Sequence, residues 1–109
     1  MATISIDDFR NLELRVGTIT AAAPHPNADR LVVLTVDLGT EQRQLVAGIR
    51  AHYEPQSLVG KQIIVVANLQ PTTLRGVESQ GMLLAASDEQ GRLSLVIPEK
   101  PVANGSQVK

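Results

Sequence analysis

Hydrophobic and polar positions alternate over several short stretches of the chain, which predicts a protein built mainly from β-strands. In residues 12–20, Leu12, Leu14 and Val16 share one face, and Ile19 resumes the pattern after Gly17, where we expect a bulge or a bend. Five more strands are predicted, within residues 31–39, 43–49, 61–69, 81–87 and 93–99. Six short strands separated by turns indicate a small barrel or a sandwich.

The sequence ISIDDFRNL at residues 4–12 predicts a short N-terminal helix. Ser5 can cap this helix, Asp8 follows at the spacing of a capping box, and Ile4 and Phe9 occupy the positions of a hydrophobic staple. Asp7 and Asp8 are carboxylates beside the positive end of the helix. We therefore favour a capping role for them over a catalytic carboxylate pair.

The connections between the predicted strands point to a particular barrel. Residues 50–60 carry a proline and a glycine with little alternation, so we expect a helical turn between the third and fourth strands. An all-β OB-fold, a five-stranded Greek-key barrel, binds ligands through its 1–2 and 4–5 loops. Here those loops are residues 21–30 and 68–81, the longest polar connections. Residues 101–109 are expected to be a terminal extension lying on the barrel.

Composition narrows the function classes. The chain has 109 residues, 43% of them hydrophobic, which predicts one domain over residues 1–109. No cysteine is present, so disulfides and thiolate chemistry are excluded, and no apolar run approaches the roughly 20 residues of a membrane span. The net charge of −1 disfavours coating nucleic acid by bulk charge. The only aromatics, Phe9 and Tyr53, cannot form a platform that stacks several bases.

Catalytic chemistry has little support in the sequence. His25 and His52 are isolated from any partner at nucleophile, base or metal-ligand spacing. The glycines form no phosphate-binding motif. We therefore expect no enzyme activity, no cofactor and no metal.

Binding residues gather in the two long loops instead. If these loops share one barrel mouth, Arg30 and Arg75 both face it, and their planar guanidinium groups suit phosphate oxygens. Asparagine, glutamine and serine side chains in the same loops can contact phosphate, sugar or base edges. The alternative is an ordinary solvated loop. Met82, at the start of the fifth strand, is either a core residue or part of this edge.

The motifs HPNADRL (25–31), VANLQP (66–71) and LRGVESQGM (74–82) resemble the tRNA-binding domain found at the C-terminus of many bacterial methionyl-tRNA synthetases. The same family includes a free-standing structure-specific tRNA-binding protein, and it is related to endothelial monocyte-activating polypeptide II and to a domain of the phenylalanyl-tRNA synthetase β subunit. The resemblance runs from about Phe9 to Pro98.

The resemblance implies an OB-fold, a cytoplasmic homodimer and recognition of tRNA by its shape, with an aminoacyl-tRNA synthetase as a possible partner. It assigns RNA contacts to the basic position Arg30, to Asn68, to Arg75, and to Ser79 and Met82. Together with the residues of the two loops, the candidate tRNA-binding residues are Asn27, Arg30, Asn68, Arg75, Ser79, Gln80 and Met82.

Two other functions remain open at this point. CsaA-type secretion chaperones share the fold and bind proteins, but the HPNAD and ESQGM motifs favour tRNA. A cytokine-like role, as in the eukaryotic relatives, finds no flanking segment to support it.

Overall fold

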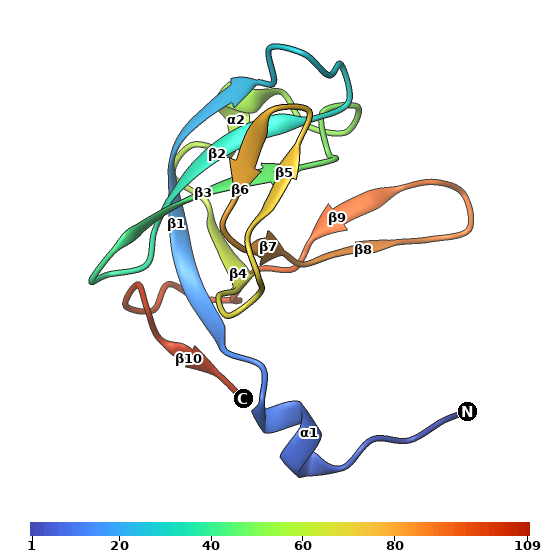
Figure 1. Ribbon diagram of the computed structural model, residues 1–109, viewed down its shortest axis with the longest axis vertical. Coiled ribbons are helices and arrows are strands. Elements are labelled where there is room, and N and C mark those ends of the chain that lie inside the picture. Colours follow the sequence, from blue (N-terminus) through green and yellow to red (C-terminus); the bar gives the residue numbers. More distant parts are fainter.

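Antiparallel strands wrap into a barrel, with one short helix outside it and another at its end (Figure 1). The computed structural model describes residues 1–109. The two helices are α1 (Ile6–Arg10) and α2 (Pro55–Leu58). The strands are β1 (Leu14–Pro24), β2 (Val32–Asp37), β3 (Gln42–Ala47), β4 (Gln62–Val66), β5 (Thr72–Leu74), β6 (Val77–Ser79), β7 (Met82–Leu83), β8 (Ala85–Ser87), β9 (Leu93–Leu95) and β10 (Gln107–Val108).

The main sheet has the strand order β3-β2-β1-β4-β7. The long strand β1 serves both halves of the sheet, because Thr18 pairs with Asp37 of β2 on one side and with Gln62 of β4 on the other. Two small hairpins, β5–β6 and β8–β9, extend from this sheet. The arrangement confirms the predicted all-β, OB-like barrel.

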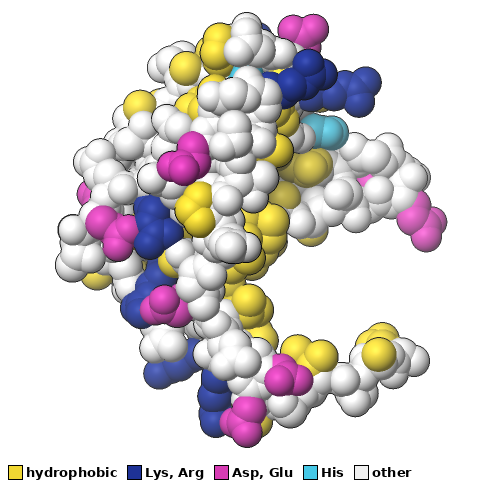
Figure 2. All heavy atoms as spheres, in the orientation of Figure 1, with side chains coloured by type: hydrophobic (Ala, Val, Ile, Leu, Met, Phe, Trp, Pro, Cys, Tyr) yellow, Lys and Arg dark blue, Asp and Glu magenta, His cyan; other side chains and the backbone are white.

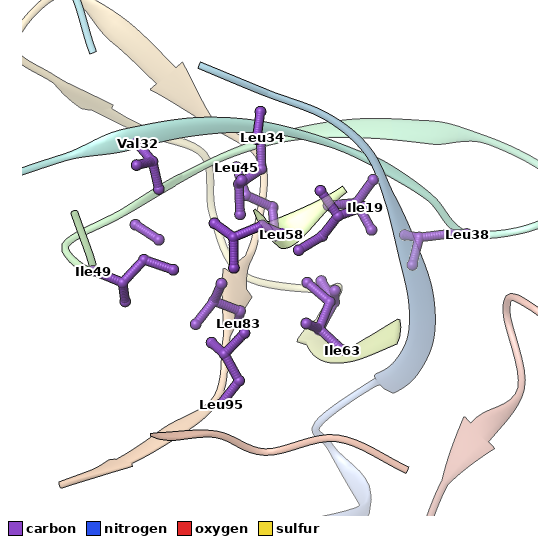
Figure 3. Packing of buried hydrophobic residues seen from close by; sticks show 14 residues of the cluster. Ile19, Val32, Leu34, Leu38, Leu45, Ile49, Leu58, Ile63, Leu83 and Leu95 are labelled. Atoms are coloured by element: carbon purple, nitrogen blue, oxygen red, sulfur yellow. The ribbon is translucent and has the colours of Figure 1, made fainter. Parts of the chain in front are cut away.

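The core fills the inside of the barrel, as Figure 3 shows. Leu58 of α2 is fully buried and lies among Leu34, Leu45 and Ile19, which come from three different strands. The segment expected to hold a helical turn therefore provides the residue at the centre of this core. The short helix α2 closes one end of the barrel.

A second, smaller cluster covers the outside of β1 and β4. Leu14, Val16, Ile64 and Val66 form it, with Phe9 packed against it. Strand β4 thus buries both of its faces, which explains the continuous apolar run IIVV at residues 63–66. The C-terminal strand β10 pairs with β1 beside this cluster, which confirms that the terminal extension lies on the barrel.

The N-terminal predictions are confirmed in part. The hydroxyl Oγ of Ser5 accepts a hydrogen bond from the backbone N–H of Asp8 at 3.0 Å, so the capping of α1 is as predicted. The hydrophobic staple is not formed as expected: Ile4 is 72% exposed, whereas Phe9 turns toward the outer cluster. Leu12 also lies outside the strand and is exposed.

A bulge or a bend is predicted at Gly17, whereas the irregularity in the pairing of β1 with β2 lies further along the strand. The register with β2 shifts between Ile19 and Ala21, and not at Gly17. A Cβ added at Gly17 meets Val36 Cγ1 at 2.5 Å, so the glycine serves close packing of β1 on β2. The shift turns Ala22 into the core, where Ile19 already lies.

The stretch from residue 68 to residue 81 is not an open loop. It contains the β5–β6 hairpin, in which Leu74 pairs with Val77 and leaves Arg75 and Gly76 as a two-residue turn. The last predicted strands are also shorter than expected, since residues 81–87 divide into β7 and β8 and residues 93–99 form only β9. No helix has the length and apolar character needed to cross a membrane.

Candidate nucleic-acid interface

The β1–β2 loop and the β5–β6 hairpin are joined by hydrogen bonds. His25 Nε2 lies 2.8 Å from the carbonyl oxygen of Leu74, and the side-chain amide of Asn27 donates to the carbonyl oxygen of Arg75 at 3.4 Å. His25 itself is buried, with 4% of its surface exposed. The two loops expected at one barrel mouth are therefore in direct contact.

Arg30 and Arg75 lie at this junction. Together with Ala28, Asp29 and Leu31 they line a hollow of about 390 Å³. Both arginine side chains are exposed. The structure thus places the two cations on one rim, as the loop topology predicted.

Arg30 and Arg75 differ from most other arginines of the chain because they form no ion pair. Four of the seven arginines pair with a carboxylate: Arg10 with Asp7, Arg15 with Glu13, Arg43 with Glu41, and Arg92 with Asp88. The other three form no ion pair. They are Arg30, Arg50 and Arg75.

The third unpaired arginine, Arg50, belongs to the same end of the molecule. Its backbone N–H donates to the carbonyl oxygen of Arg30 at 3.2 Å. Figure 2 shows Lys and Arg side chains gathered at the end where the β1–β2 loop lies. We refer to Arg30, Arg50 and Arg75 as the arginine rim. A guanidinium without a carboxylate partner is free to donate hydrogen bonds to phosphate oxygens.

Arg75 occupies the first position of the hairpin turn with a φ of +51°, and Gly76 follows with +88°. Two successive positive φ angles are those of the type I′ turn, which favours asparagine followed by glycine. A left-handed conformation costs a residue with a Cβ roughly 1–2 kcal/mol. Arg75 is therefore held at the exposed tip in a backbone conformation that its own side chain does not favour.

The side chains of Ser79 and Gln80 form hydrogen bonds with the protein's own backbone. Ser79 is 6% exposed, and its Oγ accepts from the backbone N–H of Val46 and donates to the carbonyl oxygen of Gly81, each at 2.9 Å. The side-chain oxygen of Gln80 accepts from the backbone N–H of Gln44 at 3.0 Å. These bonds fasten the base of the hairpin to β3 and close the barrel at that edge.

Asn68 ties the N-terminal helix to the barrel. Its Oδ1 accepts from the backbone N–H of Glu13 at 2.8 Å, and its Nδ2 donates to the carbonyl oxygen of Asn11 at 2.7 Å. Asn11 follows α1, which Figure 1 shows at the opposite end of the molecule from the β1–β2 loop. Asn68 therefore does not share the hollow that Arg30 and Arg75 line.

Met82 is 49% exposed on β7, so it is a surface residue and not part of the core. It lines a shallow pocket of about 230 Å³ under the β5–β6 hairpin, with Leu69 and Leu74 among the apolar residues. Five of the seven candidate residues thus form two groups. Asn27, Arg30 and Arg75 lie at the junction of the two loops, and Ser79 and Met82 lie in the pocket below the hairpin.

Sequence reasoning missed two residues of this interface. His25 gave only a weak signal, its position between two prolines, and its hydrogen bonds appear only in the folded chain. Arg50 follows β3 and gave no signal, because nothing in the pattern places the chain after β3 beside the β1–β2 loop.

Arg92 offers a contrast to the arginine rim. It lies at the β8–β9 hairpin, and its backbone N–H and then its side chain donate to Asp88, which holds the pKa of that carboxyl below its usual value. The Arg92 charge is therefore compensated locally. This residue serves as a matched control for the rim arginines.

An OB-like barrel with uncompensated arginines on its joined loops has the form of an oligonucleotide-binding domain. Comparison with known proteins agrees with this class. The sequence profile of the family described as "Putative tRNA binding domain" matches residues 14–107. The chain belongs to this tRNA-binding domain family.

Among curated relatives, the methionine–tRNA ligase of Thermococcus kodakarensis is 52% identical over 109 residues, which is 100% of this chain and 15% of that protein. The methionine–tRNA ligase of Deinococcus radiodurans is 50% identical over 106 residues, covering 97% of this chain and 16% of that protein. The chain thus spans about 15% of the length of these synthetases.

Two solved structures cover whole chains of similar size. A MetRS-related protein from Pyrococcus horikoshii has a TM-score of 0.94 at 37% identity, with 100% of both chains covered. The chaperone CsaA from Bacillus anthracis has a TM-score of 0.90 at 32% identity, covering 99% of this chain and 100% of the other. The fold is therefore similar both to that of a MetRS-related protein and to that of a CsaA chaperone.

Proposed function

We propose that this chain is a non-catalytic module, comprising residues 1–109, that binds tRNA by recognising its folded shape. The observation that carries the proposal is the arginine rim. The chain pairs its other arginines with carboxylates and leaves three unpaired at one end, on segments that hydrogen bonds hold together. Membership in the family described as a putative tRNA-binding domain supports tRNA as the ligand.

In the proposed complex, Arg30, Arg50 and Arg75 contact phosphates, and Asn27 contacts phosphate or sugar beside them. Met82 lies against the RNA from β7. Ser79 and Gln80 position the hairpin through their bonds to β3, and Asn68 holds the N-terminal segment.

Two properties of the interface favour recognition by shape: it has no aromatic platform for stacking bases, and its phosphate contacts are few and fixed in position. Phe9 and Tyr53 are both partly buried, packed against the protein's own hydrophobic clusters, so no aromatic platform stacks a run of bases. Phosphate contacts fix position without reading sequence. A few phosphate contacts at fixed spacing therefore select a folded backbone, such as the outer corner of tRNA where two loops meet.

We further propose that the module acts as a homodimer in the cytoplasm, either alone or with an aminoacyl-tRNA synthetase. Apolar side chains at the two ends of the chain lie exposed, including Ile4 at 72% and Ile97 at 56%. Figure 2 shows hydrophobic side chains along the hollowed face between the N-terminal arm and the β8–β9 hairpin. A second copy that covers this face presents two arginine rims. Near a catalytic domain, such a module raises the local concentration of tRNA.

Filter binding tests the proposed function. A folded tRNA is expected to bind more tightly than the same tRNA with its loop–loop contact broken by mutation. A tRNA with a changed anticodon is expected to bind like the parent, because the anticodon lies far from the corner. Equal binding of the folded and disrupted forms would contradict recognition by shape.

A protein-binding function, as in the CsaA chaperone, is the second candidate. The pocket of about 230 Å³ favours it, since Leu69 and Met82 lie exposed there beside Leu74. An unfolded client protein that competes with tRNA at equal concentration, and that loses binding on Met82→Ala but not on Arg30→Ala, would support this alternative.

A further inference from the structure

His25 occupies the contact between the two loops that carry Arg30 and Arg75. It is 4% exposed, between Pro24 and Pro26, and both ring nitrogens have partners. Nε2 lies 2.8 Å from the carbonyl oxygen of Leu74, and Nδ1 lies 2.9 Å from the backbone nitrogen of Asn27. One bond reaches the hairpin and the other sets the turn of the β1–β2 loop.

The partners determine which form of the imidazole fits. A carbonyl oxygen can only accept, so Nε2 must carry a hydrogen. The backbone N–H of Asn27 can only donate, so Nδ1 must be without one. The site therefore accepts a single species, the neutral ring protonated at Nε2.

We propose that His25 is a positioning residue that keeps the arginine rim assembled only while its ring is neutral. The proposal rests on the proposed tRNA binding. A second proton on the ring occupies Nδ1, directly opposite the N–H of Asn27. The bond to Leu74 survives, but the turn at Asn27 opens. The Asn27 side-chain bond to Arg75 is then broken, and Arg30, three residues further along, is released from its place.

Charged groups on the adjoining segments do not replace these bonds. His25 makes ring hydrogen bonds only to Leu74 and Asn27. The titratable or charged residues on the β1–β2 loop, the β5–β6 hairpin and the segment between β3 and α2 are Asp29, Arg30, Arg50, His52, Tyr53, Glu54, Arg75 and Glu78. All are exposed except Arg50 and Tyr53, which are half-buried. Among them His52 is the only other histidine.

The test measures tRNA affinity from about pH 8 to about pH 5, the range over which histidines change charge. All proteins carry His52→Gln, so that His25 is the one histidine left. We expect affinity to fall roughly tenfold on acidification, as for the loss of one buried hydrogen bond. In the double variant that adds His25→Gln, the amide still donates toward Leu74 but cannot gain a proton. Its binding is expected to be independent of pH.

Two outcomes overturn the proposal: binding by the His52→Gln protein that does not change with pH, or a fall that persists in the double variant. Nitrogen-15 NMR of the free His52→Gln protein gives a reading that needs neither RNA nor the His25 variant. It is expected to show Nε2 protonated and Nδ1 unprotonated at neutral pH, and the opposite tautomer refutes the geometry. Absence of tRNA binding at every pH refutes the proposed function and the positioning role with it, while the tautomer result still decides the geometry.

Discussion

Replacing one arginine of the rim should change how tRNA binding depends on salt. The variants that test this prediction are Arg30→Ala and Arg75→Ala, each of which removes a guanidinium that has no carboxylate partner. Every phosphate contact releases counterions, so the slope of log affinity against log salt becomes shallower by roughly 0.7–0.9 for each phosphate that the variant no longer neutralises. The effect appears both in affinity at fixed salt and in this slope.

The structure sets the expected magnitude. Three phosphate contacts per rim give a slope of about −2.1 to −2.7, which is roughly a 20- to 40-fold loss of affinity between about 50 and 200 mM salt. Two phosphate contacts leave a slope of about −1.4 to −1.8 and roughly a 7- to 12-fold loss. At fixed salt, removing a charge-assisted bond worth about 1.5–3 kcal/mol weakens binding at least tenfold.

Arg92→Ala is the matched control, because it changes the net charge by the same single unit, from −1 to −2, as either rim variant. Its guanidinium already pairs with Asp88 at 2.6 Å, away from the rim. Filter binding at four salt concentrations measures all three variants. If Arg92→Ala lowers affinity and slope as much as Arg30→Ala, binding depends on diffuse charge and the assignment of the rim is refuted.

The same structure supports three further predictions. Arg75→Asn should bind tRNA as weakly as Arg75→Ala but have a melting temperature several degrees higher than Arg75→Ala. Asparagine tolerates the positive φ at the turn, which raises the free energy of unfolding by up to about 1 kcal/mol. Equal melting temperatures of the two variants by calorimetry would contradict this. Leu58→Ala should lower the free energy of unfolding by about 2–5 kcal/mol in urea, since Leu58 is fully buried in the core, while the exposed neighbour Val59→Ala should change it by less than about 1 kcal/mol. Light scattering should give twice the chain mass of 11.7 kDa, and a value that stays at 11.7 kDa on concentration would count against the homodimer.

Much of the barrel could be predicted because alternation and β-branched runs report burial directly. The strands β2 and β4 and the helical segment around Leu58 lie where the pattern placed them. The β5–β6 hairpin escaped prediction because its strands have three residues each, mostly polar, and its turn is Arg-Gly where Asn-Gly is the usual signal. The pattern indicated a bulge or a bend at Gly17, because a glycine within a strand can mark either of these or a close approach of another segment. In the structure Gly17 allows close packing of β1 on β2.

The candidate site was predictable where function depends on charge and less so where it depends on hydrogen bonding. Loop topology alone brings Arg30 and Arg75 together. Ser79, Gln80 and Asn68 are polar residues in a polar segment, and such side chains can face a ligand or bond to their own backbone with equal chemical ease. Only the folded chain shows that these three bond internally.

Selectivity for a folded RNA is consistent with the way this chain distributes a charge close to zero. A protein with ten basic residues and eleven acidic ones has no net attraction for polyanions, so its long-range steering is weak. Four arginines pair with carboxylates, and this pairing weakens non-specific binding of phosphates at those positions on the surface. Outside the arginine rim the cations without a carboxylate partner are Lys61, Lys100 and Lys109. Within the rim, the hydrogen bonds of His25 and Asn27 fix the spacing of the charges. An unfolded strand gains little from fixed cations because it loses conformational freedom on meeting them, whereas a rigid RNA corner has already lost that freedom. Local neutralisation and a fixed rim therefore act together to favour a folded RNA over an unfolded strand, and weakening either one should reduce that preference.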